Sequence, residues 1–138
     1  MSVRTAPYEG AAQRMGISGD HLVQELGYDE DVDFELRDVI EEVTGEPILD
    51  EDEHEVVDAV LLWWRDGDGD LVDAMVDSLT DLDDGGVVWL LTPKLGEDGH
   101  VSPVEIQEAA PTAGLHTTST VDVSELWSAV CLQQRKRH

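Results

Sequence analysis

The sequence predicts an α/β protein with a mostly parallel sheet and helices on both of its faces. Two unbroken apolar runs, Val60 to Trp64 and Val87 to Leu91, have the length and composition of buried strands. Between them, a loop at 65–70 leads directly into an amphipathic helical pattern. Continuous apolar strands that alternate with helices are typical of sheets covered on both sides, so this order predicts the fold class.

The first part of the chain is predicted to contain a short strand and an acidic helix. The strand is expected at 21–27, and a helix follows at 31–44, with Gly45 as its C-terminal stop. Acidic side chains surround an apolar stripe on this helix, formed by Val32, Leu36, Val39, Ile40 and Val43.

The segment at 47–49 is interpreted as a short strand ahead of the long buried strand at 55–64. If both were parallel strands of one sheet, residues 50–54 would have to return the chain by the length of a strand. Five extended residues reach only about 17 Å. Either 47–49 is not a true parallel strand or a helical element has been missed, so the path of the chain at 46–56 stays open.

A second amphipathic helix follows the loop, with Asp68 or Asp70 as its N-cap. Its apolar positions are Leu71, Val72, Met75, Val76, Leu79 and Leu82. Gly85-Gly86 is then expected to form a turn, and the apolar strand at 87–91 comes next.

The last third of the chain is predicted to hold one helix and two strands. Ser102 and Glu105 have the spacing of a capping box, with Pro103 at the first helical position, and predict a helix of about two turns. Strands are expected at 115–122 and 126–134. Their connection is too short for a crossover, so they must be antiparallel.

The length of 138 residues predicts one α/β domain at 19–135, preceded by a flexible N-terminal arm at 1–18. A chain of this size buries about two thirds of the surface that its unfolded form exposes. The sequence has no apolar span of 18 residues and no signal region, so a cytoplasmic protein without a membrane partner is expected. The single Cys131 permits no internal disulfide.

The net charge of −24 comes from 32 acidic residues against 8 Lys and Arg. It disfavours nucleic-acid binding by basic contacts and binding to anionic membranes. Residues 29–58 contain fifteen acids and one base, Arg37. This segment is a solvated helix face that adds solubility, an acidic docking surface for a basic partner, or a mimic of a polyanion.

Two segments resemble the second half of a Rossmann-like methyltransferase domain: Val57 to Leu62 resembles its fourth strand, and Leu82 to Leu91 resembles its glycine turn and fifth strand. The chain from about residue 15 also resembles the bacterial family known as domain of unknown function 3052. The segments that carry this second resemblance are 33–45, 61–77, 86–94 and 109–115. The resemblance implies a single Rossmann-like, methyltransferase-like domain without an assigned activity.

One departure from active methyltransferases concerns the turn after the first strand. Such enzymes have a glycine-rich turn there, which lets the backbone approach the cofactor. In this chain the corresponding turn, Glu25 to Asp31, keeps one glycine and fills the other positions with Tyr and acids. No cofactor is therefore predicted.

Three segments are expected to meet at the carboxyl edge of the sheet: 27–31, 65–70 and 92–102. The candidate ligand-binding residues on them are Tyr28, Arg65, Asp66, Asp68, Asp70, Thr92, Lys94 and His100.

Three of these residues, Asp66, Asp68 and Asp70, have the 1-3-5 spacing of a calcium loop. The glycine and glutamate that such a loop requires are replaced by Leu71 and Asp77. A helix cap with a tight turn is the preferred interpretation, and no metal site is predicted, although calcium or magnesium binding by this loop stays an open alternative.

No catalytic motif of recognised mechanism is present in the sequence, and no catalytic residue is predicted. The favoured hypothesis is a non-enzymatic protein-binding or regulatory module with a basic protein partner. Its docking face would be the acidic helix, through Glu35, Asp38, Glu41 and Glu42, which lie off the apolar stripe and are expected to be exposed. The alternatives are a small-molecule or nucleotide sensor at the sheet edge and a divergent transferase. Partner identity and oligomeric state stay open.

Overall fold

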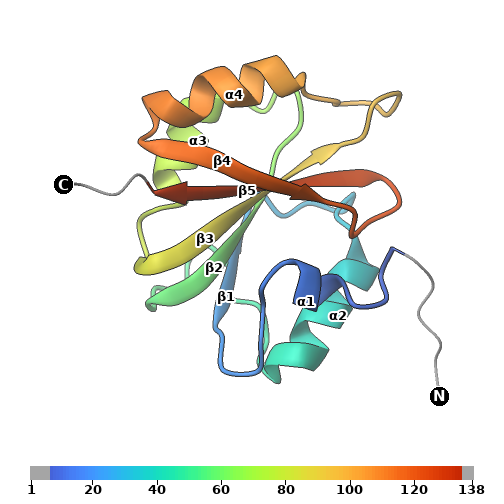
Figure 1. Ribbon diagram of the computed structural model, residues 1–138, viewed down its shortest axis with the longest axis vertical. Helices are drawn as coiled ribbons and strands as arrows, with labels where there is room; N and C mark the ends of the chain where they lie inside the picture. The colour runs from blue at the N-terminus through green and yellow to red at the C-terminus, as the bar shows by residue number, and fades with distance from the viewer. Residues whose placement is uncertain (1–6, 135–138) are drawn as a thin grey trace.

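A computed structural model describes residues 7–134, which contain a five-stranded sheet in the order β1-β2-β3-β5-β4 (Figure 1). The strands are β1 (Val23–Leu26), β2 (Val57–Trp63), β3 (Leu82–Pro93), β4 (Leu115–Val121) and β5 (Trp127–Gln134). The first three are parallel, and β5 runs antiparallel to both of its neighbours, β3 and β4. The predicted sheet with an antiparallel C-terminal pair is confirmed.

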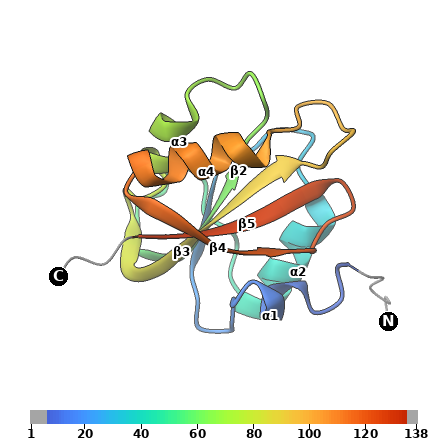
Figure 2. The ribbon, with the colours of Figure 1, turned by 45° about the horizontal axis from the view of Figure 1, so that its top comes forward.

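Helices cover both faces of the sheet, as predicted. They are α1 (Ala11–Arg14), α2 (Phe34–Thr44), α3 (Leu71–Asp77) and α4 (Pro103–Thr112). α1 and α2 lie on one face, and α3 and α4 lie on the other (Figure 2). Residues of β2 alternate between the two cores: Ala59, Leu61 and Trp63 on the α2 side, and Val60 and Leu62 on the α4 side. Burial on both faces explains the unbroken apolar run.

Side-chain caps define where the two amphipathic helices begin. α2 begins at Phe34 rather than at residue 31 because Asp33 is its N-cap and accepts a hydrogen bond from the amide of Leu36 at 3.1 Å. Of the two candidate caps for α3, Asp70 is the one used, and it accepts from the amide of Asp73 at 3.2 Å.

Two helices differ in length from the prediction. α3 ends at Asp77 instead of continuing to Leu82, and the hydroxyl of Ser78 donates to a carbonyl of its last turn at 2.5 Å. α4 is capped by Ser102 as predicted but has ten residues, because its last turn packs Ala110 against the sheet. Within residues 7–134, no helix is long and apolar enough to cross a membrane.

The predicted turn at Gly85-Gly86 is wrong, because both glycines lie inside β3. The register between β2 and β3 shifts between Val57 and Ala59, and β3 is irregular opposite this point. A Cβ atom on Gly86 would lie 2.5 Å from Cδ1 of Leu82 and 2.8 Å from a backbone oxygen of β2. Gly86 is thus required by close approach within the sheet.

One residue of the open region at 46–56 joins the sheet. Leu49 forms an isolated parallel bridge with Gln24 of β1, held by two backbone hydrogen bonds of 2.9 Å. The segment at 47–49 is therefore a single bridge and not a strand, so no return by a strand's length is needed. After β1 the chain forms α2 and returns to the sheet at Leu49, on one side of β1. It then crosses to β2, which pairs with the other side of β1. The order in which the chain adds to the sheet therefore changes direction at β1 and β2.

The prediction of a flexible arm at 1–18 is wrong for residues 8–17, which pack on the α2 side of the sheet; residues 1–6 lie outside the described range. The buried side chains are Tyr8, Ala11, Ala12, Met15 and Ile17. The hydroxyl of Tyr8 donates to Asp33 at 2.6 Å, and burial together with this hydrogen bond raises the pKa of Tyr8 to about 12. Tyr8, Ala11, Ala12 and Met15 have the i, i+3, i+4, i+7 spacing of a helix face, but the helix has only four residues and two of these side chains are alanines, so the pattern was too short and too weakly apolar to be recognised.

Candidate functional site

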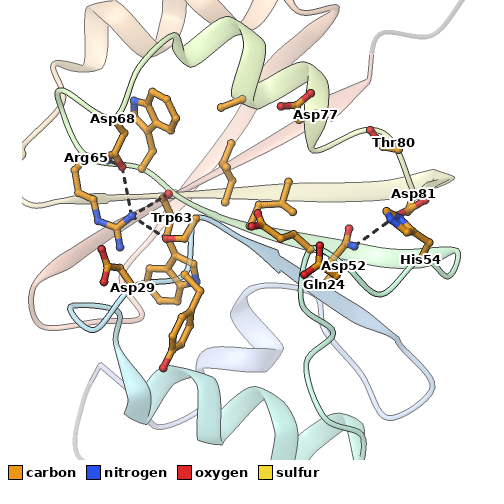
Figure 3. A pocket seen from close by; sticks show the side chains of 17 residues that line it. Gln24, Asp29, Asp52, His54, Trp63, Arg65, Asp68, Asp77, Thr80 and Asp81 are labelled. Carbon is orange, nitrogen blue, oxygen red and sulfur yellow. Dashed lines mark hydrogen bonds and ion pairs between the residues drawn. The ribbon is translucent and has the colours of Figure 1, made fainter.

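A crevice of about 610 Å³ lies between β1, β2, α3 and the loop that precedes β2 (Figure 3). Arg65, Asp68 and Asp29 lie at one end of it, and His54 and Asp81 lie at the other. This β1–β2 crevice includes the carboxyl ends of the two strands between which the chain reverses direction. Open α/β sheets bind ligands at such points.

Arg65, directly after β2, closes the carboxyl end of the crevice. Its Nε and Nη2 donate to the two carboxylate oxygens of Asp31 at 3.0 and 2.5 Å. Nη1 donates to the carbonyl oxygen of Gly27 at 2.8 Å, and Asp68 lies 3.4 Å from the same nitrogen. The guanidinium also lies 5.1 Å from the ring centre of Trp127. Arg65 therefore joins the ends of β1, β2 and β5.

The Arg65–Asp31 pair is bidentate, which is the strong geometry for an arginine and a carboxylate. The hydrogen bond from Arg65 lowers the pKa of Asp31 below its ordinary value, against the opposing effect of burial. The side chain of Arg65 is 15% exposed, whereas that of Asp31 is 55% exposed. The pair thus forms a partly solvated clamp over the strand ends.

Gly27 gives the closest backbone approach in the crevice. Its φ is +76°, a conformation that favours glycine, and a Cβ atom built on it would lie 2.2 Å from the carbonyl oxygen of Trp63. The backbone after β1 therefore sits directly against the end of β2. The single glycine kept in the turn at 25–31 serves this strand-to-strand contact.

A buried ionic network lies behind the crevice, on the α2 side of the sheet. Glu25 of β1 is 4% exposed and accepts from Nη2 of Arg37 at 2.7 Å and from the indole of Trp63 at 3.1 Å. The hydrogen bond with Glu25 raises the pKa of Arg37, against the effect of burial. Arg37 also lies 5.1 Å from the ring centre of Tyr28. This network fixes α2 against β1 and β2.

The far end of the crevice carries a histidine–aspartate pair. Nδ1 of His54 lies 2.9 Å from Oδ2 of Asp81, and the hydrogen bond with Asp81 raises the pKa of His54. Gln24, which is 3% exposed, donates to the carbonyl oxygens of Asp50 and Glu53 at 3.3 and 3.1 Å. Gln24 thereby holds the acidic loop beside the crevice.

The three segments predicted to meet do so. Arg65 contacts both Gly27 and Asp31, and the amide of Asp66 donates to the carbonyl oxygen of Gly99 at 2.8 Å. Their candidate side chains nevertheless separate into different hollows. Tyr28, Arg65 and Asp68 line the β1–β2 crevice.

The remaining candidates lie elsewhere. Asp66 and Asp70 line a shallow hollow between the loop and α4, and Thr92 and His100 line a small cavity under α4. Lys94 pairs with Asp122 at 3.2 Å. The eight candidates do not form one site, because they line three separate hollows or, in the case of Lys94, pair with Asp122.

The carboxylates of the 66–70 loop have separate partners. Asp68 accepts from the amide of Arg65 at 3.0 Å, and Asp70 caps α3. Within the described part of the chain, no group of three or more His, Cys, Asp and Glu residues has an arrangement that could hold a metal ion. Cys131 is buried in β5, and burial raises the pKa of its thiol.

The acidic helix differs from its prediction at one position. Glu35, Asp38 and Glu42 are exposed, but Glu41 is half-buried and accepts from the amide of Ile48 at 2.8 Å. The expectation that Glu41 is exposed is wrong, because this carboxylate fixes the chain after α2.

Several residues that line the crevice or lie beside it were not among the sequence candidates. Asp31, which binds Arg65, and Glu25, which lies behind the crevice, stood in the turn that the sequence singled out. Gln24 and Glu25, two polar residues inside an apolar strand, were an available signal. His54 and Asp81 stand in loops 27 residues apart, and no local pattern relates them.

The arrangement of strands and helices in this chain is found in solved structures of other proteins. Several solved structures are similar to this chain over most of its length. One is the pyocyanin biosynthetic protein PhzM (14% identity, TM-score 0.64, 91% of this chain and 53% of that one). The O-methyltransferase NcsB1 from neocarzinostatin biosynthesis, solved with S-adenosyl-L-homocysteine, is 17% identical with a TM-score of 0.62, over 94% of this chain and 52% of that one. The chain spans about half the length of both. CcbJ from Streptomyces caelestis has a TM-score of 0.58 at 12% identity, over 93% of this chain and 89% of that one. The fold is therefore Rossmann-like and methyltransferase-like.

Within that fold, the chain belongs to the protein family of unknown function DUF3052, whose model matches residues 12–136. Uncharacterized proteins of Mycobacterium tuberculosis and Mycobacterium bovis are 56% identical to it over 125 residues, which cover 91% of this chain and 78% of theirs. The predicted family is confirmed.

Proposed function

We propose that the protein is a non-enzymatic binding module whose partner is a basic protein. The observation that carries this proposal is that the Lys and Arg side chains of residues 7–134 all bind oxygen atoms of the chain itself. Arg37, Arg65 and Lys94 each form an ion pair within the chain, and Arg14 donates to backbone carbonyl oxygens, including that of Asp122 at 2.9 Å. The surface that these residues leave to a partner is dominated by carboxylates. Such a field favours encounter with a basic partner.

The closed carboxyl end of the crevice supports binding rather than catalysis. Arg65 occupies the position beside Gly27 and is held there by Asp31 on one side and Trp127 on the other. A methyl-transfer cofactor that used this turn would have to displace that clamp. In this proposal the methyltransferase-like fold holds a surface for binding a protein partner and does not catalyse methyl transfer.

The favoured docking face is the exposed side of α2, with Glu35, Asp38 and Glu42, together with the acidic loop at 50–53. Arg37 of α2 and the loop line one hollow of about 490 Å³, and Glu41 binds the amide of Ile48, so the two segments are neighbours. We name this surface the α2 face. It joins two acidic stretches that are separate in the sequence.

The test compares two charge reversals of equal size. One variant carries Glu35→Lys, Asp38→Lys and Glu42→Lys on the α2 face. The control carries Asp83→Lys, Asp84→Lys and Asp98→Lys, which are exposed elsewhere. Proteins are captured from a mycobacterial cytosolic extract at low and high salt and quantified by mass spectrometry. We expect a basic partner that the wild type and the control retain at low salt and that the α2 variant loses by about tenfold.

Two results would contradict the proposal. If the α2 variant retains the partner as well as the control does, the α2 face is excluded as the docking face. If both variants lose the partner to the same extent, only the overall charge attracts the captured protein. Circular dichroism of each variant establishes that it is folded.

A small-molecule sensor is the second candidate, and the β1–β2 crevice favours it. Its volume of about 610 Å³ lies within the range usual for ligand sites, roughly 300–1,000 Å³. Titration calorimetry with S-adenosylmethionine, S-adenosylhomocysteine and adenosine separates the alternatives. We expect no saturable heat from the first two, because Arg65 and the side chains of the turn fill the cofactor's position. Saturable binding of S-adenosylmethionine would favour the divergent transferase, and binding of adenosine alone would favour the sensor.

A further inference from the structure

A second cavity, of about 180 Å³, lies under α4 where the helix crosses β3, β5 and β4. We name it the α4 cavity. Its polar lining consists of Thr92, Thr117, Thr120, Ser128, Gln107 and His100, and four apolar side chains complete it. Thr92 of β3 stands opposite Ser128 of β5 in the sheet, so their side chains share one face. The β1–β2 crevice and the α4 cavity have no lining residue in common.

The lining of the α4 cavity contains no Asp, Glu, Lys or Arg, in a chain with 32 acidic residues. By contrast, six of the seventeen residues that line the β1–β2 crevice are acidic. A charged ligand would lose hydration in the α4 cavity without gaining an ionic partner. An anion would in addition be repelled by the acidic surface. The lining therefore selects an uncharged ligand.

Thr92 supplies an unused polar group. The residue is 2% exposed, and its hydroxyl forms no hydrogen bond with any residue of the described chain. No fully enclosed side-chain nitrogen or oxygen in that part of the chain lacks a partner, so the oxygen of Thr92 must be open to the cavity that it lines. A hydroxyl or amide group of a bound molecule can therefore form a hydrogen bond with the hydroxyl of Thr92 in place of water.

His100 has a defined tautomer when neutral. Its Nδ1 lies 2.9 Å from the carbonyl oxygen of Pro93, which can only accept, so Nδ1 carries the proton. Nε2 is then left as an acceptor. With the hydroxyls of Thr92 and Ser128, which both donate and accept, the lining matches a ligand that itself has several hydroxyl groups.

We propose that the α4 cavity binds a small uncharged polyol. Its volume equals that of about six molecules of liquid water, which suits a short sugar alcohol rather than a nucleotide. The apolar walls contact the carbon chain, while Thr92, Ser128 and the Nε2 atom of His100 bind its hydroxyls. Thr117 and Thr120 are exposed on the edge strand β4, so the cavity opens to solvent there.

The test titrates glycerol, erythritol and xylitol into the ¹⁵N-labelled protein, with acetate and putrescine as charged molecules of similar size. We expect saturable amide shifts confined to residues 92, 100–102, 104–107, 117–120 and 128 for at least one polyol, at concentrations up to about 50 mM. We expect no saturable shift there from acetate or putrescine.

Two matched variants identify the groups that bind. Thr92→Val keeps the shape of the side chain and removes its hydroxyl, and we expect it to weaken binding about tenfold. The control Thr118→Val makes the same change on β4 outside the cavity and should bind like the wild type. The melting temperature of Thr92→Val, measured without polyol, shows whether its fold is intact.

Three results would overturn the proposal: no saturable shift from any polyol, equal binding by the wild type and Thr92→Val, or equal binding of the charged molecules. If Thr92→Val unfolds, Ser128→Ala replaces it under the same criteria.

Discussion

The β1–β2 crevice and the α4 cavity both lie where strands of one sheet end, yet they differ in almost every chemical property. The crevice is rich in carboxylates and is closed by Arg65, whereas the α4 cavity has hydroxyl, amide and imidazole groups and no formally charged carboxylate or ammonium. At the crevice, Arg65 joins the ends of β1 and β2 through Gly27 and Asp31, and Arg37 pairs with Glu25 of β1. Under α4, apolar side chains of the helix such as Ile106 pack on the sheet. The comparison teaches that this acidic chain places two of the four Lys and Arg side chains of residues 7–134 beside β1 and β2, and none of the four in the lining of the α4 cavity.

The strongest way to break the crevice is to add one methyl group. Gly27→Ala places a Cβ atom 2.2 Å from the carbonyl oxygen of Trp63 at a φ of +76°. We expect a loss of about 3 kcal/mol or more in unfolding free energy. Gly45→Ala is the matched control: its φ is +73° but nothing lies within 4 Å of the added atom, so about 1 kcal/mol is expected. Urea denaturation measures both, and equal losses would mean that the contact with Trp63 is unimportant.

The buried network tests whether ion pairs stabilise the crevice more than uncharged groups stabilise the α4 cavity. Arg37→Met leaves Glu25 buried without its ionic partner, and we expect a loss of about 2–3 kcal/mol. Lys94→Met removes the exposed pair with Asp122 and should cost less than about 0.5 kcal/mol. In the α4 cavity, Thr92→Val should change stability by no more than about 0.5 kcal/mol. If Arg37→Met costs no more than Thr92→Val in urea denaturation, the contrast between the two regions fails.

The clamp of Arg65 makes a smaller, pH-dependent contribution. The folded pKa of Asp31 is lowered, so this stabilisation is complete above the unfolded pKa of about 3.9 and is lost as the pH falls through the folded value. Because Asp31 is half exposed, less than about 1 kcal/mol is expected. The wild type should be more stable than Asp31→Asn at pH 6, and the difference should shrink below about pH 4. A difference that is constant with pH would exclude an ionic clamp.

The smallest expected effect is at the far end of the crevice. The pKa of His54 is raised by Asp81, so the stabilising pair is fully present below the unfolded pKa and is lost as the pH rises through the folded value. An NMR titration of the imidazole protons should place the midpoint of His54 above 6.5 in the wild type and return it toward that value in Asp81→Asn. An unchanged midpoint in the variant would show that the pair is absent in solution.

Much of the fold could be predicted because the signals were local. The apolar runs identified β2 and part of β3, and the cap residues Asp70 and Ser102 marked helix starts within a few residues of their own positions. The errors also have physical causes. Gly85-Gly86 has turn composition but lies in β3, where the register with β2 shifts and a Cβ atom on Gly86 would clash with Leu82 and with the backbone of β2.

The candidate site was predictable only in part. The strand order brought 27–31 beside 65–70, as expected from a parallel sheet, and this placed Arg65 at the crevice. Thr92 shares a face of β3 with Val88 and Leu90, and no local pattern specifies which helix covers that face. That Thr92 and Arg65 line different cavities was therefore known only from the tertiary structure.

The sequence by itself determined the fold class, the family, the net charge and the positions of most helices and strands, because periodicity, caps and composition act over a few neighbouring residues. Only the tertiary structure decided that the N-terminal segment packs into the core, that Arg65 binds Asp31 and that hydroxyl groups gather under α4. Each of these depends on single side chains far apart in the chain, and their meeting is set by strand order and register rather than by local preference.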